Sequence, residues 1–236
     1  MLRGQTGNSN RPAKALFEKV LIADGHESSN MSVRKTLEEF GLANSDYVFY
    51  CDDAFMRIAN ALMNGNPYDL LITNLTFDKD HTPQNITNGT DLIRVVKDLQ
   101  PDIKILVFSE ESKPLVVDQL FKDLAIDAFV RKARRDVTEL KLALEAISNN
   151  RKYLSTGLRQ SIKDTSTYEF RTYDIVLISL LSKGILQKDI PEYLREHEIK
   201  PFGLSSVEKR LNHIREALNF TKNEQLVGYC KDIGVI

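Results

Sequence analysis

The sequence contains no tryptophan and only two cysteines, Cys51 and Cys230, which lie far apart in the 236-residue chain. Two isolated thiols exclude a disulfide framework and a cysteine-ligated metal cluster, and they are typical of a reducing compartment. No apolar run approaches the ~20 residues that a membrane-spanning helix needs. The first seventeen residues are polar and lack the apolar segment of a secretory signal. These absences predict a cytoplasmic protein that makes no membrane contact.

The chain also lacks an excess of charge of either sign. Lys+Arg 32 and Asp+Glu 33 give a formal net charge of -1 at pH 7. A strongly basic chain, the simplest signature of nucleic-acid binding, is therefore excluded, so any such binding has to come from a local surface. Hydrophobic residues make up 42% of the sequence, which is enough for an ordinary core, and the length suits one large domain or two small ones.

Short apolar segments alternate with helical patterns in the first part of the chain. Leu92, Val95, Val96 and Leu99, for example, recur at the spacing of one helix face. The apolar segments are typical of strands buried on both faces, and they lie at residues 20–22, 47–49, 70–72, 103–108 and 129–130. Five strand–helix units predict an α/β doubly wound, five-stranded parallel sheet with helices on both faces. Ligands of such sheets bind beyond the carboxyl ends of the strands.

The strand pattern ends near residue 147. Residues 148–167 are polar and have no apolar periodicity, which predicts a linker. After it only helical patterns occur, such as the stripe of Val207, Leu211, Ile214 and Leu218. The sequence therefore predicts an α/β domain at residues 19–147, a linker at 148–167 and a small all-α bundle at 168–236.

Four polar residues follow the predicted strands, namely Asp24, Asn74, Ser109 and Lys132. The stretches around them are LIADGHES at 21–28, YDLLITNL at 68–75, KILVFSEES at 104–112 and AFVRKARR at 128–135. Together they resemble the receiver domain of bacterial two-component response regulators, most closely the LuxR/NarL type. The resemblance covers about residues 19–147 and implies the flavodoxin-like sheet of that family.

The receiver family phosphorylates an aspartate at the end of the third strand, and this chain has Asn74 there. A neutral amide is a poor nucleophile and brings no charge to the Mg²⁺ that the family's reaction requires. The family also has two adjacent acidic residues after the first strand. Here only Asp24 matches, because Gly25 occupies the second position. One of the three expected carboxylates therefore remains.

Other positions of the family pattern are occupied. Ser109 matches the hydroxyl residue that follows the phosphoryl group, Lys132 matches its lysine partner, and Phe129 matches the switch aromatic. The residue after the serine is normally small, but here it is Glu110, whose carboxylate would repel a phosphate. The resemblance thus implies a pseudo-receiver with a degenerate phosphoacceptor pocket, no catalytic residue, no metal and no cofactor. These residues also have an ordinary structural interpretation, in which Asp24 pairs with Lys132 at the sheet edge.

The predicted loop at residues 77–90 is long for a connection from a strand to a helix. Asp78, Asp80 and His81 within it could ligate a metal, although polar loop residues are more often solvated. A second interpretation of the receiver keeps phosphorylation and uses Asp78 or Asp80 as the acceptor.

The segments at 180–194 and 203–220 resemble the LuxR-type helix-turn-helix, and the resemblance covers about residues 168–236. The second helix of this motif, here within 203–220, places its exposed N-terminal part in the major groove of DNA. Lys209, Arg210 and Arg215 would neutralise phosphates. The residues predicted to bind DNA are Ser205, Ser206, Glu208, Lys209, Arg210, Asn212, His213 and Arg215. Residues 195–203, however, replace the usual turn of three or four residues, so the way in which this helix docks on DNA is open.

Residues 168–236 contain 10 Lys+Arg and 10 Asp+Glu. A neutral domain has few charges for phosphates, so two copies on paired half-sites are expected. The sequence predicts a transcription regulator of the response-regulator type that acts without phosphorylation, binds double-stranded DNA as a homodimer and docks a signalling protein on its receiver. The alternative is a signalling adaptor, also not an enzyme, whose helical domain binds protein instead of DNA.

Overall fold

The computed structural model describes residues 17–42, 44–78, 80–165 and 168–236. The chain divides into two compact units. The first consists of residues up to Glu111 together with Leu120–Ser155, and the second of Ser112–Gln119 together with Thr156–Ile236. Within the described ranges, every helix is too short or too polar to cross a membrane.

The first unit is built on a parallel sheet with the order β2-β1-β3-β4-β5-β6. Its order reverses between β1 and β3, which makes the carboxyl ends of these strands the natural ligand site. The doubly wound, flavodoxin-like fold class predicted from the sequence is confirmed, with one strand more than predicted. The strands are β1 (Val20–Ala23), β2 (Ser45–Val48), β3 (Leu70–Thr73), β4 (Lys104–Ser109), β5 (Ala128–Arg131) and β6 (Tyr153–Leu154).

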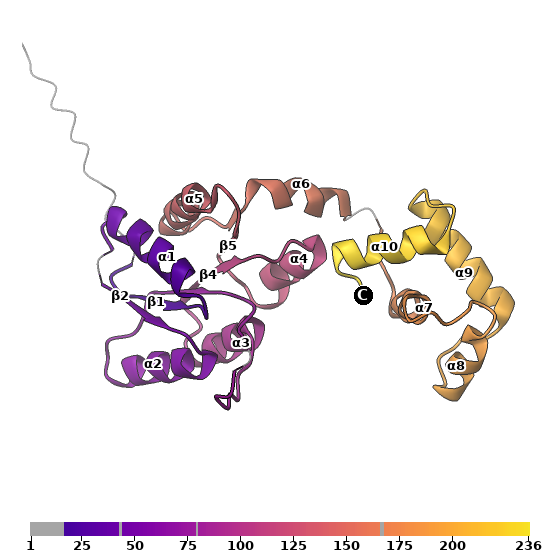
Figure 1. The fold of residues 1–236 in the computed structure, drawn as a ribbon, viewed down its shortest axis with the longest axis horizontal. Helices are drawn as coiled ribbons and strands as arrows, with labels where there is room; N and C mark the ends of the chain where they lie inside the picture. The colour runs from indigo at the N-terminus through magenta and orange to yellow at the C-terminus, as the bar shows by residue number, and fades with distance from the viewer. Residues whose placement is uncertain (1–16, 43, 79, 166–167) are drawn as a thin grey trace, which may run out of the picture. The chain divides into compact units, whose positions relative to one another are not determined.

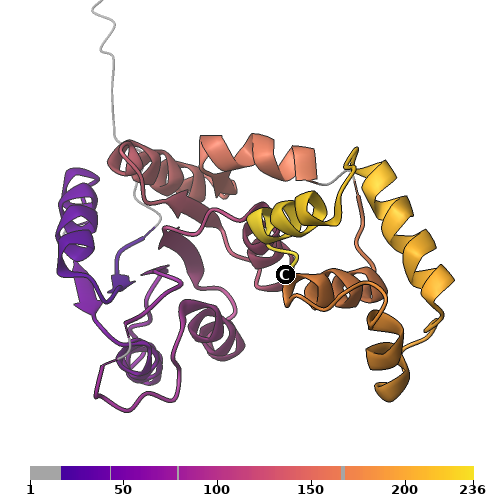
Figure 2. The same cartoon turned by 45° about the vertical axis from the view of Figure 1, so that its right-hand side comes forward.

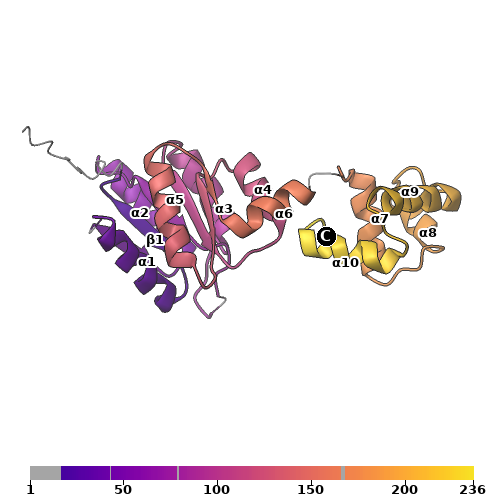
Figure 3. The same cartoon turned by 90° about the horizontal axis from the view of Figure 1, so that it is seen from above.

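Helices cover both faces of the sheet (Figures 1 and 3). Ile22, Ile72 and Phe108 of the central strands pack in one core cluster with Leu37 and Leu144 from α1 and α5. Because neighbouring strand residues point to opposite faces, the alternate residues face the side that α2 and α3 cover. The helices of this part of the chain are α1 (Glu27–Glu39), α2 (Cys51–Met63), α3 (Gly89–Leu99), α4 (Pro114–Asp123) and α5 (Asp136–Ser148).

Residues 148–167, predicted as a linker, contain regular structure. Strand β6 pairs with β5 through only two residues, Tyr153 and Leu154, and α6 (Thr156–Thr165) follows it. Leu158 is the buried apolar residue among the described side chains of α6. A two-residue strand and a helix with so small an apolar face have no periodicity long enough to be recognised in the sequence. Residues 166–167 lie outside the described residues.

The helices α7 to α10 form a bundle with a continuous apolar core (Figures 1 and 2). Leu177 and Ile190 meet Val207, Leu211 and Ile214 of the long helix α9 in this core. The predicted stripe of α9 is therefore its buried face, with Leu218 at its edge packed against the cluster. The bounds are α7 (Thr172–Ser182), α8 (Ile190–Glu196), α9 (Leu204–Ala217) and α10 (Asn223–Ile233).

The connection from α8 to α9 is a seven-residue loop at 197–203. The backbone of Glu198 is left-handed (φ 55°), and the Ile199 N–H donates to the Leu194 carbonyl at 2.8 Å. This arrangement closes the last turn of α8, and the partly buried Ile199 packs against the core. The predicted insertion at 195–203 thus consists of the last two residues of α8 and a seven-residue loop.

Gly89 begins α3 where the chain passes very close to β3. A Cβ atom at Gly89 would lie 1.9 Å from the carbonyl oxygen of Asn74 and 2.9 Å from the Cα of Leu75. The Gly89 N–H also donates to the Leu75 carbonyl at 2.9 Å. Only glycine allows this approach, which holds the start of α3 against the carboxyl end of β3.

We expect Gly89→Ala to lower the free energy of unfolding by about 1–3 kcal/mol, because the new methyl group overlaps backbone atoms that cannot move without displacing β3. Urea unfolding followed by circular dichroism measures this change. Gly25→Ala is the control, since a Cβ there has no neighbour closer than 3.8 Å. Equal stability of the two variants would show that the approach of α3 is not tight.

Candidate functional site

The four polar residues predicted to follow the strands lie at one edge of the sheet. Ala23 is in register with Thr73, so Asp24 and Asn74 are the residues that follow adjacent strands. Ser109 ends β4 in register with Arg131, directly before Lys132. The Asn74 N–H donates to the Ala23 carbonyl at 3.0 Å, and the Lys132 N–H donates to the Ser109 carbonyl at 2.8 Å. The structure therefore brings this predicted set together.

Asp24 and Lys132 form an ion pair at this edge of the sheet. The Lys132 Nζ lies 2.7 Å from the Asp24 Oδ2, and the two side chains are 11% and 4% exposed. The other carboxylate oxygen, Oδ1, accepts the His26 backbone N–H at 3.0 Å, and the His26 Nδ1 lies 3.2 Å from it. Lys132 also lies over the ring of Phe108, with Nζ 5.4 Å from the centroid. Both oxygens of the carboxylate therefore have partners within the chain.

Asn74 is buried, and its side-chain oxygen binds the backbone next to it. The Oδ1 accepts the Leu75 N–H at 2.8 Å and the Thr76 N–H at 3.4 Å. The backbone amides of the following loop thus orient the Asn74 side chain. An amide held in this way offers no anionic oxygen for attack on phosphorus.

The remaining positions of the pocket differ in exposure. Ser109 is buried, and its Oγ accepts the Glu111 N–H at 3.4 Å, whereas Glu110 is exposed. At Gly25 a Cβ would have Asp78 N at 3.8 Å and Phe49 O at 3.9 Å as its nearest neighbours. A side chain could therefore be accommodated at position 25 without displacing the backbone.

The side chains present do not fit the Mg²⁺ that the reaction of the receiver family requires. Hard divalent cations select several oxygen ligands, with carboxylates providing the charge. Position 74 is an amide, position 25 has no side chain, and Asp24 is neutralised by Lys132 at 2.7 Å. Among the residues that the structure describes, no cluster of three or more His, Cys, Asp or Glu could hold a metal ion.

Phe129 of β5 is fully buried. Its neighbours Ala128 and Val130 belong to the core cluster with α1 and α5, so the Phe129 ring faces the opposite side of the sheet. The ring of the predicted switch aromatic is thus buried in the interior of the first unit.

The long loop between β3 and α3 is held against the start of α2. Asp52 accepts the N–H groups of Asn85 at 2.8 Å and Ile86 at 2.9 Å, and Asp80 accepts the Tyr50 hydroxyl at 2.5 Å. This hydroxyl, with the Thr82 N–H, holds the pKa of Asp80 below its usual range.

The other residues of this loop that were considered as metal ligands are exposed. The Asp78 side chain is 76% exposed and lies 3.7 Å from the His26 Nε2, and His81 is exposed. Lys79 between them lies outside the described residues. The loop aspartates therefore anchor the loop or face solvent.

Both cysteines are free and buried. Burial raises the pKa of Cys51, and likewise that of Cys230, to about 12. A thiol with such a pKa is protonated near neutral pH and is a poor nucleophile.

Helix α9 turns most of the predicted DNA-binding residues outward. Val207, Leu211 and Ile214 are buried, and Ser206 beside them is partly exposed. The exposed members of the predicted set are Ser205, Glu208, Lys209, Asn212 and His213.

Arg210 differs from the expectation that it neutralises a phosphate. Its Nε and Nη2 donate to the two carboxylate oxygens of Asp174 at 2.6 and 2.7 Å, and Asp174 is completely buried. The hydrogen bonds to Asp174 raise the pKa of Arg210 above its usual value. Arg210 therefore joins α9 to the start of α7, and its charge is balanced within the chain.

Arg215 also has partners within the bundle, because its guanidinium donates to the side-chain oxygens of Asn212 and Asn223. By contrast, Lys209 has no ion-pair partner among the described residues. Asp174 is not among the residues predicted from the sequence, although an aspartate in the first turn of a helix is a recognisable signal: it accepts the Arg171 N–H at 3.0 Å.

Comparisons with known proteins agree with this architecture. Solved structures of RcsB match the chain over both units. The structure of two RcsB dimers bound to two parallel DNAs is 22% identical, with a TM-score of 0.66, and the match covers 92% of this chain and 98% of that chain. The chain has the RcsB fold.

A Salmonella typhimurium RcsB response regulator structure is 20% identical, has a TM-score of 0.67 and is matched over 91% of this chain and 99% of its own. The two-component response regulator RcsB–DNA complex is 21% identical, with a TM-score of 0.62, over 92% of this chain and 98% of its own. No protein-family model and no curated protein matches the sequence.

We expect Lys132→Met to lower the free energy of unfolding by about 3–5 kcal/mol, because it leaves the buried Asp24 carboxylate without its cation. The double variant Asp24→Asn/Lys132→Met should recover most of this loss. Lys141→Met is the matched control, because Lys141 pairs with Glu39 at 2.5 Å while both side chains are nearly half exposed. The control should lose less than about 1 kcal/mol.

Urea unfolding measures all three variants. If Lys132→Met and Lys141→Met were equally stable, the Asp24–Lys132 pair would have no special role in the pocket.

Proposed function

We propose that this protein is a DNA-binding transcription regulator of the response-regulator type whose receiver-like domain works without phosphorylation. In this proposal residues 19–147 are the receiver-like domain, residues 148–167 connect it, and residues 168–236 bind DNA. It acts in the cytoplasm and catalyses no reaction.

The observation that carries the DNA-binding proposal is the exposed face of α9 in a fold shared with RcsB. RcsB structures are described as complexes with DNA, including one from Salmonella enterica serovar Typhimurium bound to promoter P1flhDC, with a TM-score of 0.61 and 20% identity. In this chain the exposed Asn212 and Glu208 carry the amide and carboxylate groups that pair with adenine and cytosine edges. Lys209 adds a free cation beside them.

Independence from phosphorylation is supported by the pocket at the sheet edge. An amide stands at the acceptor position, and the remaining carboxylate of Asp24 is bound to Lys132 at 2.7 Å. A phosphoryl group at position 74 would have neither a nucleophile to form its bond nor a cation-binding site beside it.

The partners that we propose are duplex DNA, a second copy of the chain and a signalling protein that docks on the receiver-like domain. The pairing of copies is supported by charge, because residues 168–236 carry 10 Lys+Arg and 10 Asp+Glu. A neutral domain gains little from counterion release at one half-site. Two linked domains on paired half-sites bind more tightly through their high effective concentration.

The same neutrality, with Arg210 bound to Asp174, favours the signalling adaptor as a second candidate function. In that case the exposed face of α9 would contact a protein partner. Selection from random duplexes separates the two functions.

We expect the purified protein to enrich a pseudo-palindromic site from a library of random duplexes, because two α9 helices would contact half-sites about one helical turn apart. Lys209→Glu should abolish the enrichment without lowering thermal stability, since the Lys209 side chain is exposed and unpaired. Arg210→Glu is unsuitable for this test, because it would place a second carboxylate beside the buried Asp174.

Glu192→Gln on α8 is the control for the enrichment, because Glu192 is exposed and lies outside α9. No enriched site with the wild-type protein would refute DNA binding and support the adaptor.

A further inference from the structure

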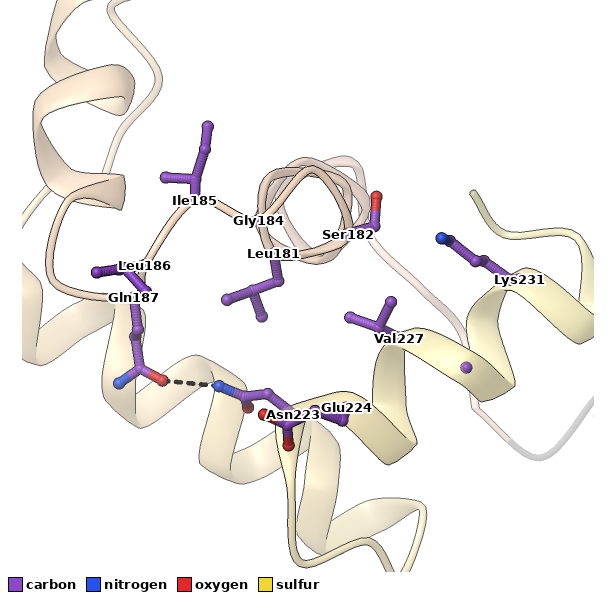
Figure 4. A pocket seen from close by; sticks show the side chains of 11 residues that line it. Leu181, Ser182, Gly184, Ile185, Leu186, Gln187, Asn223, Glu224, Val227 and Lys231 are labelled. Atoms are coloured by element: carbon purple, nitrogen blue, oxygen red, sulfur yellow. Dashed lines mark hydrogen bonds between the residues drawn. The ribbon is translucent and has the colours of Figure 1, made fainter.

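Two hollows among the described residues of the helical unit differ in charge. One, of about 510 Å³, lies between the end of α7 and α10, where Leu181 and Val227 point into it and Asn223 Nδ2 donates to Gln187 Oε1 at 3.0 Å (Figure 4). Its ionisable lining residues are Glu224 and Lys231, so their charges cancel. Nothing in the structure indicates what would cover this groove.

The second hollow, of about 530 Å³, lies where the N-terminal half of α9, the start of α7 and the loop at 197–203 meet. We call it the cationic groove. It has no acidic residue among those that line it, which are Arg171, Tyr173, Lys200, Pro201, Ser206, Lys209, Arg210 and His213.

Three of the cations in the cationic groove are uncompensated. Arg171, Lys200 and Lys209 are exposed, and their side chains have no ion-pair partner among the described residues. Arg210 is the fourth cation, and Asp174 balances it by two hydrogen bonds of 2.6 and 2.7 Å. The cationic groove therefore carries a positive charge, although residues 168–236 are neutral overall, and it suits an anion.

Lys200 comes from the inserted loop, and that loop is attached to α7. The Tyr173 hydroxyl donates to the Pro201 carbonyl at 2.5 Å, and the Arg171 N–H donates to Asp174 at 3.0 Å. The loop is thus hydrogen-bonded to the start of α7. The start of α7 is in turn joined to α9 by the pair of Asp174 and Arg210.

The cationic groove runs along one side of α9. Ser206, Lys209 and His213 line it at intervals of three and four residues, whereas the exposed stripe of Ser205, Glu208 and Asn212 lies on the neighbouring face. If this stripe lies in the major groove of a duplex, the phosphate backbone that borders the major groove lies beside the cationic groove of the protein.

We propose that the cationic groove binds consecutive phosphodiesters of the DNA backbone, and that the inserted loop contributes through Lys200, with Arg171 and Lys209 as its partners. This inference rests on the proposed DNA-binding function. Such contacts position the protein on the duplex without reading sequence. The loop that lengthens the helix-turn-helix then supplies part of the charge that the neutral domain otherwise lacks.

The test measures affinity for the duplex obtained by selection as a function of KCl concentration. Each phosphate contact contributes about 0.9 to the slope of log affinity against log salt concentration. Lys200→Gln and Arg171→Gln should each lower the slope by about 0.9 and weaken binding about eightfold at about 0.1 M salt. They should not change which sequence is selected.

Lys183→Gln is the matched control. Lys183 is exposed at the far end of α7, about 18 Å along the helix from Arg171 at 1.5 Å per residue, and it should leave the slope unchanged. If the wild-type protein binds DNA but Lys200→Gln and Arg171→Gln keep its slope, this inference is wrong and the proposed function stands. Failure of the wild-type protein to bind any duplex overturns both.

Discussion

The buried ion pair between Asp24 and Lys132 is the interaction on which the account of the receiver-like unit depends. Parallel strands deliver both residues to the same edge of the sheet, and the charges lie 2.7 Å apart with little exposure to water. A pocket with three carboxylates would have excess negative charge and would need a cation to balance it. With Asn74 and Gly25 at two of those positions, the lysine alone balances the single remaining carboxylate. This balance within the chain supports the proposal that the receiver-like domain works without phosphorylation.

The helical unit also contains a buried carboxylate that is paired with a cation. Asp174 is completely buried, and an unpaired carboxylate there would lower the stability of the fold. Arg210 from α9 forms a bidentate ion pair with it. This pair joins α7 to α9, and the charge of Arg210 is balanced within the chain. The charges left for phosphates are then few, and their placement around the cationic groove matters more than the net charge of the domain.

Much of this could be predicted from the sequence because it follows from local patterns. The buried strands, the amphipathic helices and the polar residues at strand ends gave the sheet edge, where Asp24, Asn74 and Lys132 meet. Strand β6 and helix α6 could not be predicted, because two paired residues and one buried leucine leave no periodic signal. The partner of Arg210 depends on the packing of α7 against α9, thirty-six positions apart. The cationic groove likewise depends on where a loop folds back, which the hydrogen bond from Tyr173 to Pro201 determines.

The central claim is that the pocket at the sheet edge cannot take a phosphoryl group, and mass spectrometry of the intact protein after incubation with acetyl phosphate and Mg²⁺ tests it most directly. Gly25→Asp/Asn74→Asp/Glu110→Ala is the positive control, because position 25 has space for a side chain, position 74 already lies beside Asp24, and the carboxylate that would repel a phosphate is removed. We expect no added phosphate on the wild-type protein, and a phosphate on the triple variant. A stoichiometric phosphate on the wild-type protein, whether mapped to the pocket or to Asp78 or Asp80, would contradict the central claim.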